Sequence, residues 1–204
     1  MTRAVVTLAT GPHERLLEIA LPSFRSFADR HGYELVVASE RDASRPPSWS
    51  KIPALAAALE QHDEALWLDA DVVVIDGDDD LDAPAGCWQA MVEHLTADGA
   101  VPNTGVWLVR RPMLPILEEM WAMTRYVHHG WWEQAAMLEL LGYTDTRPVA
   151  LGASTMLLGR THFLDAGWNV HRNDRRRADR PRIMHATMYP DREAVMSGWA
   201  AATA

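Results

Sequence analysis

Two carboxylates, two residues apart, follow an apolar run in the first half of the chain. Leu66-Trp67-Leu68 leads into Asp69-Ala70-Asp71, and three valines come next. The apolar run predicts a buried strand, and side chains two residues apart at its end point to one face. Paired carboxylates on one face suit a divalent cation with a preference for oxygen ligands, such as Mg²⁺ or Mn²⁺. The spacing predicts a metal site for diphosphate chemistry, and its alternative is a solvated turn.

A second polar segment follows the first apolar run of the chain. Thr10 and Gly11 come after residues 4–9, Pro12 suits the first position of a helix, and Arg15 lies one turn further on. The backbone N–H groups at the start of a helix favour phosphate groups. We therefore expect Thr10, Gly11 and Arg15 to contact a nucleotide, although a plain helix start would look the same.

The elements that must position these residues alternate between strands and helices. The apolar patterns predict strands over residues 4–9, 33–38, 66–68, 105–109 and 154–158, and helices from Pro12 onward and over residues 48–61, 113–126 and 132–141. This order predicts an α/β fold, a single Rossmann-like domain over residues 1–204 with a mostly parallel central sheet flanked by helices. Ligands bind at the carboxyl ends of the strands in such sheets, where both polar segments would emerge.

Composition limits the function further. Among the 204 residues, 28 are acidic and 19 basic, for a formal net charge of −9, which argues against nucleic acid as a partner. The single cysteine, Cys87, excludes an internal disulfide framework and favours a reducing, cytoplasmic location. No apolar run approaches the ~20 residues that span a bilayer. We expect a protein without a membrane anchor.

Two polar segments of the second half could contact a sugar. Asn103 and Thr104 offer hydrogen-bond donors and acceptors for hydroxyl groups, unless they merely begin a strand. Trp131 and Trp132 are adjacent at a predicted helix start, so both cannot face the core, and an exposed indole offers a plane on which a sugar ring can stack. We expect one indole to be exposed and these four residues to contact a sugar.

Five segments, in their order along the chain, resemble glycosyltransferases of the GT-A fold that use nucleotide sugars, most closely the retaining galactosyl- and xylosyltransferase family. They are Trp49-Ser50-Lys51, residues 67–71, residues 102–110, Trp132-Glu133-Gln134 and Ile183-Met184-His185. The chain is shorter than typical members, lacks their anchor and stem, and has Glu133 where many relatives have aspartate. These departures leave the substrate open.

The resemblance implies roles for individual residues. Asp69, Asp71 and a late histidine, here His185, would bind the metal, and a histidine ligand favours Mn²⁺, with Mg²⁺ possible. Asp69, Ala70 and Lys51 would lie at the donor, and the acidic residue with its glutamine, Glu133 and Gln134, at the reacting carbon. The four residues that could contact a sugar, Asn103, Thr104, Trp131 and Trp132, would bind the acceptor.

The implied reaction moves a hexose or pentose, UDP-linked by preference, to a hydroxyl of a small soluble acceptor, with retention. Two alternatives stay open. One is a phosphatase of the haloacid dehalogenase type, although its aspartate motif normally follows the first strand. The other is a non-catalytic carbohydrate-binding domain.

Two charged segments remain outside this reading. Residues 76–82 form an acidic run that predicts a solvated turn, because calcium-ligand spacing is missing. Residues 172–182 are rich in arginine and predict either a solvated loop or a loop that closes over an anionic ligand.

Overall fold

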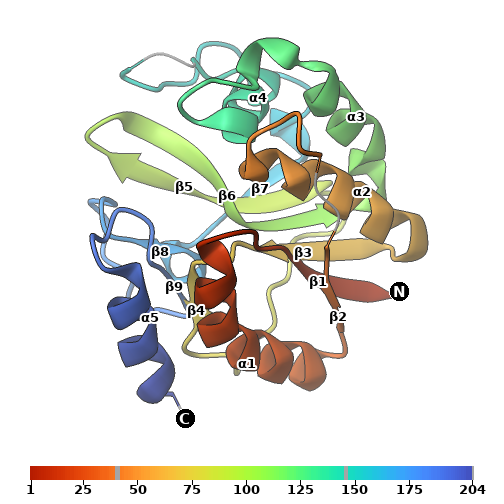
Figure 1. The fold of residues 1–204 in the computed structure, drawn as a ribbon. Coiled ribbons are helices and arrows are strands. Elements are labelled where there is room, and N and C mark those ends of the chain that lie inside the picture. Colours follow the sequence, from red (N-terminus) through yellow and green to blue (C-terminus); the bar gives the residue numbers. More distant parts are fainter. Residues whose placement is uncertain (40–41, 145–146, 204) are drawn as a thin grey trace.

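The computed structural model describes residues 1–39, 42–144 and 147–203, and a six-stranded sheet forms its centre (Figure 1). The strand order is β2-β1-β3-β6-β5-β7. The strands are β1 (Arg3–Thr7), β2 (Glu34–Val37), β3 (Glu64–Leu68), β5 (Gln89–Thr96), β6 (Gly99–Arg110) and β7 (Thr161–Leu164). The first three are the apolar runs of the first half of the chain, and β1 lies parallel to both of its neighbours, as predicted.

The sheet is mixed rather than mostly parallel in its second half. Strand β6 runs antiparallel to β3 and to β5, whereas β7 is parallel to β5. Only residues 97–98 separate β5 from β6, and a connection this short can join only antiparallel strands. The hairpin explains why β6 begins at Gly99, well before the predicted start at residue 105.

A second, three-stranded sheet was not predicted. It contains β4 (Val72–Val74), β9 (Ile183–His185) and β8 (Val170–His171), in the order β4-β9-β8. Strand β4 pairs antiparallel with β9, and this register sets His185 opposite Val72. Asp69 and Asp71 therefore lie at the junction of the two sheets, between the end of β3 and the start of β4.

Helices cover the central sheet on its two faces (Figure 1). On one face lie α1 (His13–His31), the small sheet and α5 (Arg192–Ala201); on the other lie α2 (Lys51–Gln61), α3 (Leu114–Ala122) and α4 (Trp132–Leu141). The alternation of side chains along β3 builds both cores, because Leu66 and Leu68 face α1 while Ala65 and Trp67 face α2. Strand β3 is therefore packed on both faces, next to the end that carries Asp69.

Several local predictions need correction. Residues 154–158 do not form a strand; they form a turn that leads into a short 3₁₀ helix, and the strand follows at β7. The predicted helix over 113–126 ends at Ala122 and is followed by a 3₁₀ turn, whereas the prediction for α4 matches its bounds. The 3₁₀ helices are Pro47–Ser50, Arg111–Met113, Thr124–Tyr126, Leu158–Arg160 and Ala166–Trp168.

The acidic and the arginine-rich segments are irregular loops, mostly exposed or half-buried, as predicted, and ion pairs join them. Arg180 forms ion pairs with Asp76 and Asp79, and Arg182 forms them with Asp79 and Asp165. These contacts fasten part of the arginine-rich segment to the acidic one. Within the described ranges, no helix is long and apolar enough to cross a membrane.

Candidate active site

The junction of the two sheets brings three potential metal ligands together. The backbone N–H of Asp69 donates to the carbonyl of Gly105 on β6, and the N–H of Val72 donates to the carbonyl of Asp69, which turns the chain sharply between β3 and β4. One ligand atom each from Asp69, Asp71 and His185 lies within 4.8 Å of the others. His185 Nε2 is 3.3 Å from Asp71 Oδ1. Residues 116 positions apart along the chain thus meet at one point.

The surroundings of this cluster fit a divalent cation. A Cβ atom at Gly105 would lie 2.5 Å from His185 Cε1 and 2.9 Å from Asp69 Oδ2, so only glycine leaves this space open. The donor set is two carboxylates and an imidazole, which suits Mn²⁺ or Mg²⁺. Asp71 and His185 are buried, and Asp69 is half-buried, so one side of the cluster stays accessible.

An arginine that the sequence analysis missed touches the same cluster. Arg192, the first residue of α5, donates to Asp71 Oδ2 at 3.0 Å and contacts His13 Nε2. Burial would raise the pKa of Asp71, but His185 and Arg192 outweigh it and hold that pKa well below its usual range. Asp71 is therefore kept ionised. No sequence signal marks Arg192, because α5 packs against α1 from the far end of the chain.

Lys51 links the aspartate cluster to Glu133. Its ammonium lies 3.1 Å from Asp69 Oδ1 and 3.0 Å from Glu133 Oε1, and it donates to the carbonyl of Thr104 at 2.9 Å. Burial lowers the pKa of Lys51, but the charges of Asp69 and Glu133 outweigh that effect and raise it. The lysine stays charged. A cation at the first position of a helix interacts unfavourably with the helix dipole, and Lys51 is the first residue of α2. Its ion pairs with the two carboxylates offset this effect.

Glu133 has an unused acceptor. Its Oε1 accepts from Lys51 and from the hydroxyl of Thr104, whereas its buried Oε2 has no hydrogen-bond partner among the described residues. A buried carboxylate oxygen without a partner is costly, and such groups concentrate at functional sites. The neighbouring Gln134 binds Asn103 through its Oε1 at 3.1 Å.

The predicted acceptor residues differ in accessibility. Thr104 is buried, and its hydroxyl is engaged with Lys51 and Glu133. Asn103 is half-buried. Of the two adjacent indoles, Trp132 is 45% exposed and Trp131 only partly so, which confirms that one of them faces solvent. Trp132 also has a left-handed backbone, with φ of 47°, at the start of α4; strain of this kind is common beside active sites.

The predicted nucleotide residues lie at the neighbouring strand ends. Thr10 and Gly11 follow β1, next to the end of β3, and Gly11 has the left-handed φ of 58° that favours glycine. Ala70 is buried between the two aspartates. Arg15 lies on the exposed side of α1 and pairs with Glu18 and Glu193, so these pairs must open before Arg15 reaches a nucleotide.

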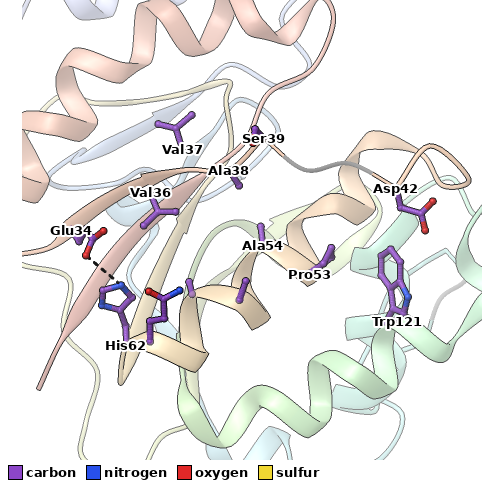
Figure 2. A pocket seen from close by; sticks show the side chains of 13 residues that line it. Glu34, Val36, Val37, Ala38, Ser39, Asp42, Pro53, Ala54, His62 and Trp121 are labelled. Carbon is purple, nitrogen blue, oxygen red and sulfur yellow. Dashed lines mark ion pairs between the residues drawn. The ribbon is translucent and has the colours of Figure 1, made fainter.

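A pocket of about 640 Å³ lies elsewhere, between β2 and α2 (Figure 2). Val36, Ala38 and Ala54 line its middle, with Glu34 and His62 at one end and Trp121 at the other. None of the predicted site residues lines it. The chemistry-bearing side chains gather at the end of β3, and this pocket is separate from them.

Two comparisons with known proteins return glycosyltransferases. Residues 9–100, somewhat less than half of the chain, match the model of the galactosyl transferase GMA12/MNN10 family. No curated protein matches the sequence. Among solved structures, a glycosyltransferase involved in glycosylation of the major capsid of PBCV-1 matches with a TM-score of 0.72 at 16% identity, over 96% of this chain and 99% of that one.

The chain has the GT-A glycosyltransferase fold. The galactosyltransferase LgtC, solved with donor and acceptor sugar analogues, matches with a TM-score of 0.58 at 14% identity, over 98% of this chain and 96% of that one. A mutant of Drosophila beta-1,4-galactosyltransferase 7, in complex with manganese, UDP-Gal and xylobiose, matches with a TM-score of 0.50 at 16% identity. The match covers 87% of this chain and 76% of that one. The GT-A fold disfavours the phosphatase alternative, and the partial family match points in the same direction.

Proposed function

We propose that this protein is a glycosyltransferase, which moves a hexose or pentose from a UDP-sugar to a hydroxyl group, with a divalent cation, Mn²⁺ by preference, and with retention at the sugar carbon. The observation that carries the proposal is the cluster of Asp69, Asp71 and His185 over the open space at Gly105. Two galactosyltransferases of the same fold support it, one with manganese and UDP-Gal and one with donor and acceptor analogues.

In this proposal Asp69, Asp71 and His185 hold the cation. A bound cation would stabilise the charge that develops on the departing diphosphate. Lys51 pairs with Asp69 and holds its carboxylate in place, and Thr10, Gly11 and Ala70 lie beside the nucleotide. Arg15 is a further candidate for the phosphates once its surface pairs open.

Glu133 and Gln134 lie on the reacting side of the donor. The free Oε2 of Glu133 can stabilise positive charge on the sugar ring as the glycosidic bond breaks, and covalent attack is the less favoured use of the same oxygen. In a retaining reaction in which the acceptor attacks the face of the sugar from which the diphosphate departs, the departing phosphate itself accepts the proton of the acceptor hydroxyl.

Trp132 and Asn103 form the acceptor side of the proposal. The exposed indole offers a flat apolar surface to a sugar ring, and Asn103 can bind hydroxyl groups. Because the hydroxyl of Thr104 already bonds Lys51 and Glu133, the proposal gives Thr104 a supporting role at Lys51 and leaves it out of the acceptor side. A small soluble acceptor in the cytoplasm, in keeping with the single Cys87, completes the proposal.

A thermal-shift panel tests the donor half of this function. UDP, GDP, CDP and dTDP are added with and without Mn²⁺ to the wild type and to Asp71→Ala. We expect UDP to raise Tm only with Mn²⁺ and only in the wild type, since a ligand at 100 times its Kd adds about 2.7 kcal/mol. A larger shift with another nucleotide would reassign the donor, and an equal shift in Asp71→Ala would remove Asp71 from the site.

A further inference from the structure

A continuous chain of hydrogen bonds between side chains joins His185, one of the three potential metal ligands, to Gln134. His185 Nδ1 lies 3.0 Å from Asn169 Oδ1, and Asn169 Nδ2 donates to Asn103 Oδ1 at 2.8 Å. Asn103 Nδ2 then donates to Gln134 Oε1 at 3.1 Å. Asn169 is fully buried and lies between the 3₁₀ helix 166–168 and β8. The sequence analysis gave it no role.

A backbone group fixes the direction of every bond in this chain. The N–H of Gly105 can only donate, and it donates to Asn103 Oδ1 at 2.9 Å. Asn103 must therefore turn its oxygen toward Gly105 and Asn169, and its NH₂ toward Gln134. Because Asn169 spends its NH₂ on that oxygen, it presents its own oxygen to His185.

The consequence for His185 is a defined proton position. A ring nitrogen facing an amide oxygen must carry a proton, so Nδ1 donates and Nε2, which faces Asp71, is the nitrogen left for a metal. The consequence for Gln134 is a defined orientation. Its oxygen is engaged, so its NH₂ is the group that it can present to a ligand.

We propose that Asn169 is a positioning residue, which holds His185 with Nδ1 protonated and Nε2 toward the metal and, through Asn103, sets the orientation of Gln134. The part that concerns the metal rests on the proposed function. Hydrogen-bond partners of ligating histidines typically change metal affinity or activity 10–100-fold when they are removed.

Two substitutions at Asn169 separate positioning from structure. Asn169→Leu removes the acceptor that His185 needs and the donor that Asn103 needs. Asn169→Asp keeps an acceptor for His185 but removes the donor to Asn103. Gln89→Leu is the matched control, because Gln89 is an equally buried amide, bonded to Trp107 and Thr161 outside the cluster.

The first readout is the proton on His185 in metal-free protein, from ¹⁵N–¹H long-range spectra at alkaline pH, with His185→Gln to assign the signals. We expect a protonated Nδ1 in the wild type, in Asn169→Asp and in Gln89→Leu, and its loss in Asn169→Leu. An unprotonated Nδ1 in the wild type would overturn the proposal, whether or not the protein transfers sugar.

The second readout is the affinity for Mn²⁺ alone, by electron paramagnetic resonance. We expect Asn169→Leu to bind Mn²⁺ 10–100-fold more weakly, and Asn169→Asp and Gln89→Leu to bind it within about threefold of the wild type. If Asn169 had a purely structural role, the buried charge of Asn169→Asp would weaken Mn²⁺ binding at least as much as Asn169→Leu does. That result would overturn the inference. A wild type with protonated Nδ1 that binds no Mn²⁺ would refute the metal site while leaving the positioning of His185 intact.

Discussion

Gly105 is the residue whose replacement should most directly disturb the cluster of Asp69, Asp71 and His185. In Gly105→Ala the new methyl carbon would lie 2.5 Å from His185 Cε1 and 2.9 Å from Asp69 Oδ2. The first separation is about 1 Å short of an ordinary carbon–carbon contact, so the imidazole or β6 must shift by that amount. Metal–ligand distances tolerate only about 0.2 Å. Displacing a ligand should cost at least as much as removing its hydrogen-bond partner, which is 10–100-fold in Mn²⁺ affinity, or about 1.4–2.8 kcal/mol.

The assay is an Mn²⁺ titration followed by electron paramagnetic resonance, with thermal unfolding of the same samples. Overpacking should also lower the free energy of unfolding by about 1–3 kcal/mol, and each kcal/mol corresponds to about 2–4 °C in Tm at this chain length. Gly198→Ala is the matched control: it lies inside α5 with nothing within 4 Å, so it should leave Mn²⁺ affinity unchanged and stabilise the helix by about 0.5–1 kcal/mol. A folded Gly105→Ala protein with wild-type Mn²⁺ affinity would refute the reasoning.

Three further substitutions test individual contacts. Lys51→Met leaves two carboxylates without their cation and should lower the free energy of unfolding in urea by about 3–5 kcal/mol; an unchanged midpoint would contradict the ion pairs. Arg192→Met removes the guanidinium from Asp71 and should raise the affinity for Mn²⁺ alone by about two- to fivefold, since an ion pair with a partly exposed partner contributes up to about 1 kcal/mol. Equal or weaker binding would show that Arg192 does not compete with the cation for Asp71. Glu133→Gln should slow transfer by about 10²-fold or more while the thermal shift by UDP with Mn²⁺ persists; wild-type turnover would remove Glu133 from the reacting centre.

Local sequence patterns predicted the first half of the chain, where strands and helices alternate. The strands β1, β2 and β3 and the helices between them follow from short apolar runs and helix starts, and right-handed crossovers then dictate parallel pairing. Asp69 and Asp71 were visible for the same reason, because their spacing and the strand before them are contiguous in the chain.

Long-range pairing escaped the sequence analysis. The β4-β9-β8 sheet joins residues 72–74 to residues 183–185, and no local pattern records that contact. His185 was found only through a resemblance to known transferases, and Asn169 and Arg192 were missed because an isolated asparagine or arginine carries no spacing signal.

The most direct test of the account is release of UDP from a panel of UDP-hexoses and UDP-pentoses, by the wild type and by Asp71→Ala, with Mn²⁺ and with a chelator. A covalent change in the sugar is what separates a transferase from a domain that only binds carbohydrate. We predict that the wild type releases UDP from at least one of these donors when Mn²⁺ is present, and that chelation or Asp71→Ala abolishes the release. Equal release with the chelator, or release by Asp71→Ala at the wild-type rate, would contradict the metal-dependent mechanism.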